Sequence, residues 1–160
     1  MNPLSPRVKS IEAFQRDIEP AIIAARNELV TEENFMAYKD GESIARLGSD
    51  QEPLYSLHTR LYYFTELDVD RIRDTYNKRL LPLGFELSEK RWTSNGVEFV
   101  DYLWINEEYH AVVSSTTRLG EQTATYYYTQ GTPSDGSTGT PPQLIDQPGR
   151  IPDWFDPSLP

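Results

Sequence analysis

Three short chain reversals follow one another after Gly84, and they restrict the second half of this chain more than any other feature of the sequence. The first contains Asn95-Gly96, a pair that suits the positive φ angles of a type I′ turn. Turn-forming residues recur at 106–109 and at 118–121. The pattern therefore predicts a four-stranded antiparallel meander, with strands near 85–94, 97–106, 109–118 and 121–130.

Two segments before the meander have helical periodicity. In the first, apolar residues recur every three or four positions along one stripe, which is typical of a helix that begins after Ser10: Ile11, Phe14, Ile18, Ile22, Ala25 and Leu29. Pro20 removes a backbone donor inside this stretch and predicts a kink or a restart. The second helix is expected after Asp68, a candidate N-cap, and ends in the Pro82–Gly84 segment.

The remaining segments complete the predicted order of elements. Residues 30–53 are polar and are expected to form a long connection, with a helical turn near Ser43–Leu47. Residues 54–64 alternate in polarity and predict one strand. The order is then α-β-α-β-β-β-β, an α+β fold in which two helices pack on one face of an antiparallel meander sheet.

Two-residue loops at the three reversals would decide which strand residues share a face of the sheet. With such loops, ten residues face the helices: Phe85, Leu87, Val100, Tyr102, Trp104, Ala111, Val113, Ala124, Tyr126 and Tyr128. The opposite face gathers Trp92, Phe99, Leu103, Ile105, Val112 and Tyr127, and the strand at 54–64 adds His58, Arg60 and Tyr62. Exposed surfaces this apolar mark binding sites. The candidate partner- or ligand-binding residues are therefore Trp92, Phe99, Tyr127, Arg60 and His58.

The composition changes at Gly131, because seven of the twelve prolines follow it. We therefore divide the chain into a single α+β domain, residues 1–130, and a Pro/Gly-rich C-terminal tail, residues 131–160. The tail carries three apolar anchors near its end, Ile151, Trp154 and Phe155. They are predicted to pack on the aromatic face around Trp92, Phe99 and Tyr127. Docking on the helix side or on a neighbouring molecule is the alternative.

The composition also narrows the chemistry. Without cysteine the chain cannot form a disulfide, a thiolate metal site or a cysteine nucleophile, and two histidines, His58 and His110, are too few for a multi-histidine metal centre. The sequence contains no glycine-rich phosphate loop, so we expect no enzyme, no cofactor and no metal site. A net charge of −10 disfavours nucleic acid as a partner. No apolar run reaches the ~20 residues that a membrane span needs.

A family resemblance rests on the residues that lead into the meander, namely Asp68, Asp70, Tyr76 and the segment 80–85, LLPLGF. Over roughly residues 54–130, this helix followed by Trp- and Tyr-rich strands resembles the soluble domains of actinobacterial lipoproteins of the LppA-like kind. The resemblance implies a secreted, cell-envelope protein of unknown function that is anchored through a lipidated N-terminal cysteine. It supplies no catalytic residues. Because the chain has no cysteine, such a lipid anchor would lie upstream of Met1; the alternative is a cytoplasmic protein.

Three functions stay open at this stage. The first is a non-catalytic, extracytoplasmic interaction domain that binds an unknown protein. The second is a cytosolic acidic inhibitor, or immunity-type protein, that binds a basic partner. The third is a binder of a small ligand or glycan through the aromatic sheet face.

Overall fold

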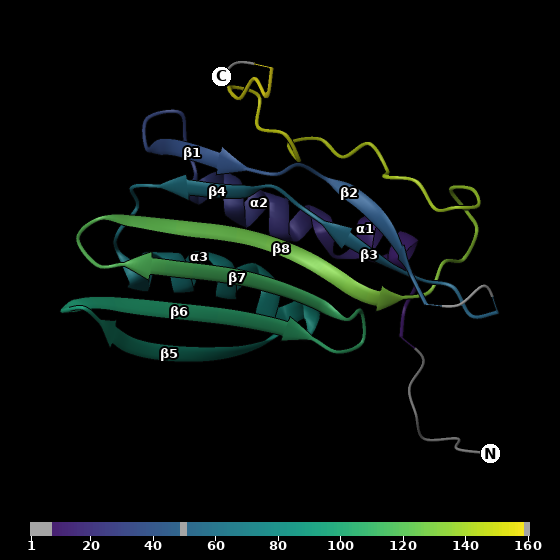
Figure 1. The fold of residues 1–160 in the computed structure, drawn as a ribbon, viewed down its shortest axis with the longest axis horizontal. Helices are drawn as coiled ribbons and strands as arrows, with labels where there is room; N and C mark the ends of the chain where they lie inside the picture. The colour runs from purple at the N-terminus through teal and green to yellow at the C-terminus, as the bar shows by residue number, and fades with distance from the viewer. Residues whose placement is uncertain (1–7, 49–50, 159–160) are drawn as a thin grey trace.

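A computed structural model describes residues 8–48 and 51–158. Across these residues the chain forms a mixed α+β fold, in which the helices lie behind one face of an open eight-stranded antiparallel sheet (Figure 1). The helices are α1 (Ile11–Asp17), α2 (Glu19–Leu29), α3 (Val69–Leu80) and the 3-10 turn η1 (Leu81–Leu83). The strands are β1 (Phe35–Lys39), β2 (Ser43–Leu47), β3 (Leu54–His58), β4 (Leu61–Phe64), β5 (Glu86–Ser94), β6 (Val97–Asn106), β7 (Ala111–Arg118) and β8 (Gln122–Thr132).

The sheet is built around β8. Its strands follow the order β1-β4-β8-β7-β6-β5, while β3 also pairs with β8, and β2 pairs with β3. One edge of β8 meets β7, and the other edge meets β4 and then β3 along its length. All of these pairs are antiparallel. The predicted α+β class, with a meander and helices on one face, is confirmed.

Local side-chain chemistry sets the helix ends as the sequence predicts. The backbone N–H of Ala13 donates to Ser10 Oγ at 3.0 Å, which caps α1. Pro20 lies in the first turn of α2, where its missing N–H costs little, so the helix restarts at that point. Asp68 accepts hydrogen bonds from the first turn of α3. Gly84, with φ 97°, ends η1 in the left-handed conformation.

The segment 30–53 is not the predicted connection, and the helical turn expected at Ser43–Leu47 is wrong. The segment contains β1 and β2, which pair with β4 and β3 respectively. Both strands are mostly exposed, so their polar side chains are compatible with a strand. Pairing with a neighbouring strand decides their conformation, and that pairing leaves little signal in the local sequence.

The strand predicted at 54–64 is two strands, β3 and β4, separated by Thr59 and Arg60. The interruption changes which alternate residues face inward: Leu57 is buried before it, and Tyr62 and Phe64 are buried after it. Tyr62 therefore packs on the helix side, under the Arg26 guanidinium, and the prediction that it lies on the open face is wrong.

The meander has the predicted strands, but its turns differ in length. The β5–β6 pairing is as predicted, with Leu87 opposite Trp104. Four residues, 107–110, join β6 to β7, which shifts the pairing by two and keeps the faces. Three residues, 119–121, join β7 to β8, which shifts the pairing by one and reverses the faces of β8. Consequently Ala124, Tyr126 and Tyr128 lie on the open face and Tyr127 on the helix face, opposite to the prediction.

The C-terminal segment runs along the helix side of the molecule and reaches β1 (Figure 1, yellow). Trp154 and Phe155 pack against Phe35, with ring centroids 5.3 and 5.5 Å away, whereas Ile151 is 44% exposed. Docking on the aromatic sheet face is therefore wrong, and the helix-side alternative is confirmed. Polar anchors explain this route, because Glu12 and Glu19 on the helices bind Ser134 and Arg150 of the segment.

No helix in the described part of the chain has the length and apolar character that crossing a bilayer requires.

Candidate functional site

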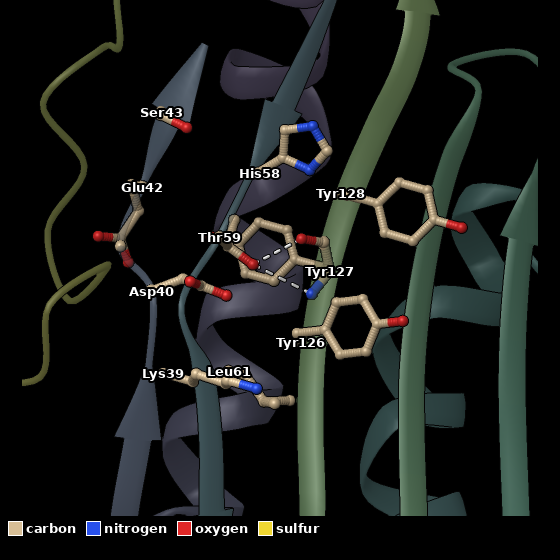
Figure 2. A pocket seen from close by; sticks show the side chains of 11 residues that line it. Lys39, Asp40, Glu42, Ser43, His58, Thr59, Leu61, Tyr126, Tyr127 and Tyr128 are labelled. Carbon is tan, nitrogen blue, oxygen red and sulfur yellow. Dashed lines mark hydrogen bonds between the residues drawn. The ribbon is translucent and has the colours of Figure 1, made fainter. Parts of the chain in front are cut away.

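A hollow of about 710 Å³ opens on the sheet face away from the helices (Figure 2). Three parts of the chain line it: residues 39–43 where β1 leads into β2, residues 126–128 of β8, and, where β3 leads into β4, His58, Thr59 and Leu61. The hollow exists because two neighbouring strand pairs are interrupted at the same level. Where β1 gives way to β2 and β3 gives way to β4, the chain leaves the regular ladder.

Between β3 and β4, the side chain of Thr59 makes the hydrogen bonds to β8 that a strand backbone would otherwise make. Its hydroxyl donates to the Tyr127 carbonyl at 2.5 Å and accepts from the Tyr127 N–H at 3.1 Å (Figure 2, dashed lines). A side chain thus satisfies the backbone of β8 where no strand residue does. β8 therefore continues without a break past the hollow.

Tyr126 and Tyr128 form an aromatic wall beside the hollow. They are two residues apart on one strand, so their side chains share the open face. Their ring centroids are 5.9 Å apart and their planes differ by 16°, which makes the pair nearly flat. Burial, and then the neighbouring Tyr126, raise the pKa of Tyr128. A tyrosine hydroxyl is protonated at neutral pH in any case, so Tyr128 can donate a hydrogen bond.

Polar side chains from β1, β3 and the β1–β2 connection line the rest of the hollow. His58 is paired with Tyr128 across β3 and β8, and its ring lies at the rim of the hollow (Figure 2). The carboxylate of Asp40 comes from the β1–β2 connection, where the backbone turns with φ 66°. Lys39 and Ser43 line the hollow on the same side as Asp40. The hollow therefore presents both aromatic rings and hydrogen-bonding groups to a ligand.

Ser56 and His58 form a pair that sequence reasoning missed. Ser56 Oγ lies 3.0 Å from His58 Nε2, a distance at which imidazole can accept a hydroxyl proton. Their spacing of two residues on a predicted strand could have revealed the pair. Ser56 is only 1% exposed, so a substrate carbonyl cannot reach its hydroxyl in this arrangement.

The five candidate residues from the sequence lie in different places. His58 lines the hollow, and Arg60 lies behind the β1–β2 connection beside Glu42. Trp92 and Phe99 stack on each other at 4.1 Å on β5 and β6, outside the hollow. The Tyr127 side chain faces the helices, where its hydroxyl donates to Glu19 Oε2 at 2.7 Å.

Placing Tyr127 on the open face is therefore wrong, and the cause is the three-residue turn before β8. The same turn explains why sequence reasoning missed Tyr126 and Tyr128. The available signal is Gly120, the middle residue of the turn, which has φ 81°, a conformation that glycine adopts at little cost. Within the described residues, no three His, Asp or Glu side chains are grouped to hold a metal ion.

Comparisons with known proteins identify a family and a solved structure with a similar fold. No curated protein matches the chain. A crystal structure of a DUF4853 family protein from Actinomyces odontolyticus ATCC 17982 is similar, with a TM-score of 0.62, 11% identity, and coverage of 92% of this chain and 86% of that chain. At this identity the likeness concerns the fold alone, and it lends no support to the LppA-like resemblance. The family model described as "Domain of unknown function (DUF4853)" matches residues 7–140, most of the sequence. The chain belongs to the DUF4853 family.

Proposed function

We propose that this protein is a non-catalytic binding domain whose ligand occupies the hollow, and that this ligand is an uncharged polyhydroxylated molecule such as a saccharide. The observation that carries the proposal is the pair of nearly parallel rings of Tyr126 and Tyr128, which line the same hollow as Asp40 and His58. A sugar ring presents C–H groups on its faces and hydroxyls around its rim. The faces can pack on the tyrosine rings, while the hydroxyls bond to the carboxylate and the imidazole.

Size and charge support this class of ligand. A volume of about 710 Å³ lies within the range of ~300–1,000 Å³ that small-molecule sites occupy. The charges that line the hollow largely cancel. Lys39 opposes Asp40, and Glu42 is paired with Arg60 at 3.4 Å. A site with so little net charge does not select strongly for an anion or a cation.

The proposal keeps an extracytoplasmic location for the domain. What supports this location is the family resemblance seen in the sequence, together with a ligand class that is abundant on cell surfaces. Fractionation of cells that express the tagged full-length protein tests it. Recovery in the envelope or medium is expected, and recovery in the cytoplasm alone overturns this part of the proposal.

Binding is tested by calorimetric titration of the protein with malto-, cello-, xylo- and chito-oligosaccharides. We expect at least one series to bind, and we expect Tyr128→Ala and Tyr126→Ala each to weaken it by about tenfold, the loss of one aromatic packing contact. Trp92→Ala is the matched control, because Trp92 is as exposed as Tyr126 and lies on the same sheet outside the hollow. It should leave binding unchanged.

Two results overturn the proposed site. One is that no oligosaccharide binds; the other is that binding survives both tyrosine substitutions. Loss of binding in Trp92→Ala alone would move the site to β5 and β6. Prolonged incubation of the protein with the oligosaccharide that it binds tests whether the domain lacks catalytic activity. Chromatography should recover the oligosaccharide intact, and any cleavage or transfer product contradicts the absence of catalytic activity.

A further inference from the structure

The wall of the hollow formed by residues 39–43 is built around one buried cation, Arg60. Its side chain is 8% exposed. Arg60 Nε donates to the Asp40 carbonyl at 3.3 Å, and Arg60 Nη1 lies 3.4 Å from Glu42 Oε2. One guanidinium therefore holds two residues of the β1–β2 connection, one through its backbone and one through its side chain.

The path of the chain at Gly41 follows from this arrangement. A Cβ added at Gly41 would lie 3.3 Å from Arg60 Nη2, so the backbone passes close to the guanidinium. Asp40, next to it, has φ 66°. The connection thus takes its shape against the Arg60 side chain, and a shift of that side chain would move the Asp40 carboxylate in the hollow.

Two aromatic rings also contact the guanidinium of Arg60. Arg60 Cζ lies 5.0 Å from the centroid of Phe155 and 5.4 Å from that of Tyr38. The two rings are perpendicular to each other, with centroids 5.0 Å apart. Phe155 is 9% exposed and also contacts Tyr62. Cation–π contacts of this kind gain strength where water is excluded.

We propose that Arg60 and Phe155 are positioning residues for the hollow: the C-terminal segment, through Phe155, fixes Arg60 and thereby the wall that carries Asp40. Phe155 lies beyond residues 7–140, which match the family model. We call the contact between Phe155 and Arg60 the clamp. Its effect on ligand affinity rests on the proposed function, whereas its effect on the conformation of residues 39–43 is independent of that function.

Hydrogen–deuterium exchange of the ligand-free protein tests the clamp directly. Phe155→Ala should speed exchange in peptides that cover residues 39–43 by about tenfold, because the wall then opens more often. Exchange in β6 should stay unchanged. Phe155→Tyr keeps the ring and should keep wild-type exchange, and Ile151→Ala, at an exposed position of the same segment, is the matched control. Arg60→Lys keeps the charge but loses the planar guanidinium, so it should also speed exchange in the wall.

Unchanged exchange at 39–43 in Phe155→Ala overturns the proposal. Equal acceleration across the whole sheet overturns it too, since that result would indicate a general loss of stability. The oligosaccharide that wild type binds then serves as the probe for affinity, and Phe155→Ala should weaken its binding. If wild type binds it and Phe155→Ala binds as tightly, the role of the clamp in binding fails while the proposed function stands. If wild type binds no oligosaccharide, the proposed function fails and the exchange result alone decides the clamp.

Discussion

Four threonines of β8 are buried, and the hydroxyls of three of them have hydrogen-bond partners, whereas Thr129 Oγ1 has none among the described residues. Thr125 Oγ1 donates to the Ser114 carbonyl at 2.8 Å and lies 2.7 Å from the Tyr76 hydroxyl. Thr123 donates to the Glu66 carbonyl, and Thr132 donates to the Tyr55 carbonyl. Because these three hydroxyls are hydrogen-bonded, the interior accepts threonine at positions where an apolar residue is usual.

A residue-scale prediction compares two tryptophans on the sheet. Trp104 has no exposed surface, and its Nε1 donates to Asn77 Oδ1 at 2.8 Å. Trp104→Ala should lower the free energy of unfolding by ~3–5 kcal/mol, because it leaves a cavity in the core. Trp92 is 37% exposed and stacks on Phe99, so Trp92→Ala should cost only ~0.5–1.5 kcal/mol. Urea denaturation followed by circular dichroism measures both, and a larger loss for Trp92→Ala would contradict the assignment of faces.

At the scale of elements, a buried ion pair joins the C-terminal segment to α2. Arg150 donates to both oxygens of Glu19, at 2.9 and 2.6 Å, and Glu19 is fully buried. Arg26 adds hydrogen bonds to the carbonyls of Gly149 and Arg150. Charged groups buried together in this way depend on each other, because the loss of one leaves the other without compensation.

Arg150→Ala should therefore lower the free energy of unfolding by ~3–5 kcal/mol, since the Glu19 carboxylate loses its cation in the interior. Arg16→Ala is the matched control. Arg16 also joins a helix to the C-terminal segment, at 3.0 Å from Asp135, but this pair is exposed and should contribute only ~0–1 kcal/mol. Thermal and urea unfolding of both variants measure the difference. Similar losses in the two would show that burial does not set the strength of the attachment.

The elements that local chemistry specifies could be predicted from the sequence. Ser10 and Asp68 mark helix starts through their side-chain oxygens, and Asn95-Gly96 marks a hairpin through its backbone preference. The β1 and β2 strands could not be predicted, because pairing with distant strands decides them. Within the candidate site, His58 was predicted, whereas Tyr126 and Tyr128 were not. The two-residue turn predicted before β8 placed them in the core, whereas the three-residue turn puts them on the open face.

At the scale of the whole molecule, two tyrosines in the core tie stability to alkaline pH. Burial raises the pKa of Tyr76 to about 12. Burial, and then the Glu19 carboxylate, raise the pKa of Tyr127 well above its ordinary value. Both hydroxyls stay protonated in the folded state at a pH where the unfolded chain ionises them, so the unfolded state binds fewer protons above pH 10.

The contribution of these two tyrosines to the free energy of unfolding should therefore be fully present below about pH 10, and it should fall as the pH rises toward 12. Tyr76 alone should account for a loss of about 2 to 3 kcal/mol over this window. Urea denaturation at pH 8, 10 and 11 measures the slope, and absorbance at alkaline pH follows phenolate formation. Tyr76→Phe should be less stable at pH 8, where it lacks the bond to Thr125, but should show a shallower slope. A flat profile up to pH 12 would contradict the prediction.

The three-residue turn before β8 has a consequence for other members of the family. Because strand residues alternate between faces, deleting one residue from 119–121 would exchange every side chain of β8 between the interior and the open face. The aromatic pair would then become core, and the threonines would become surface. A relative whose turn is one residue shorter is therefore expected to lack the aromatic pair on its open face. An alignment can be sorted on this single spacing before any ligand is known.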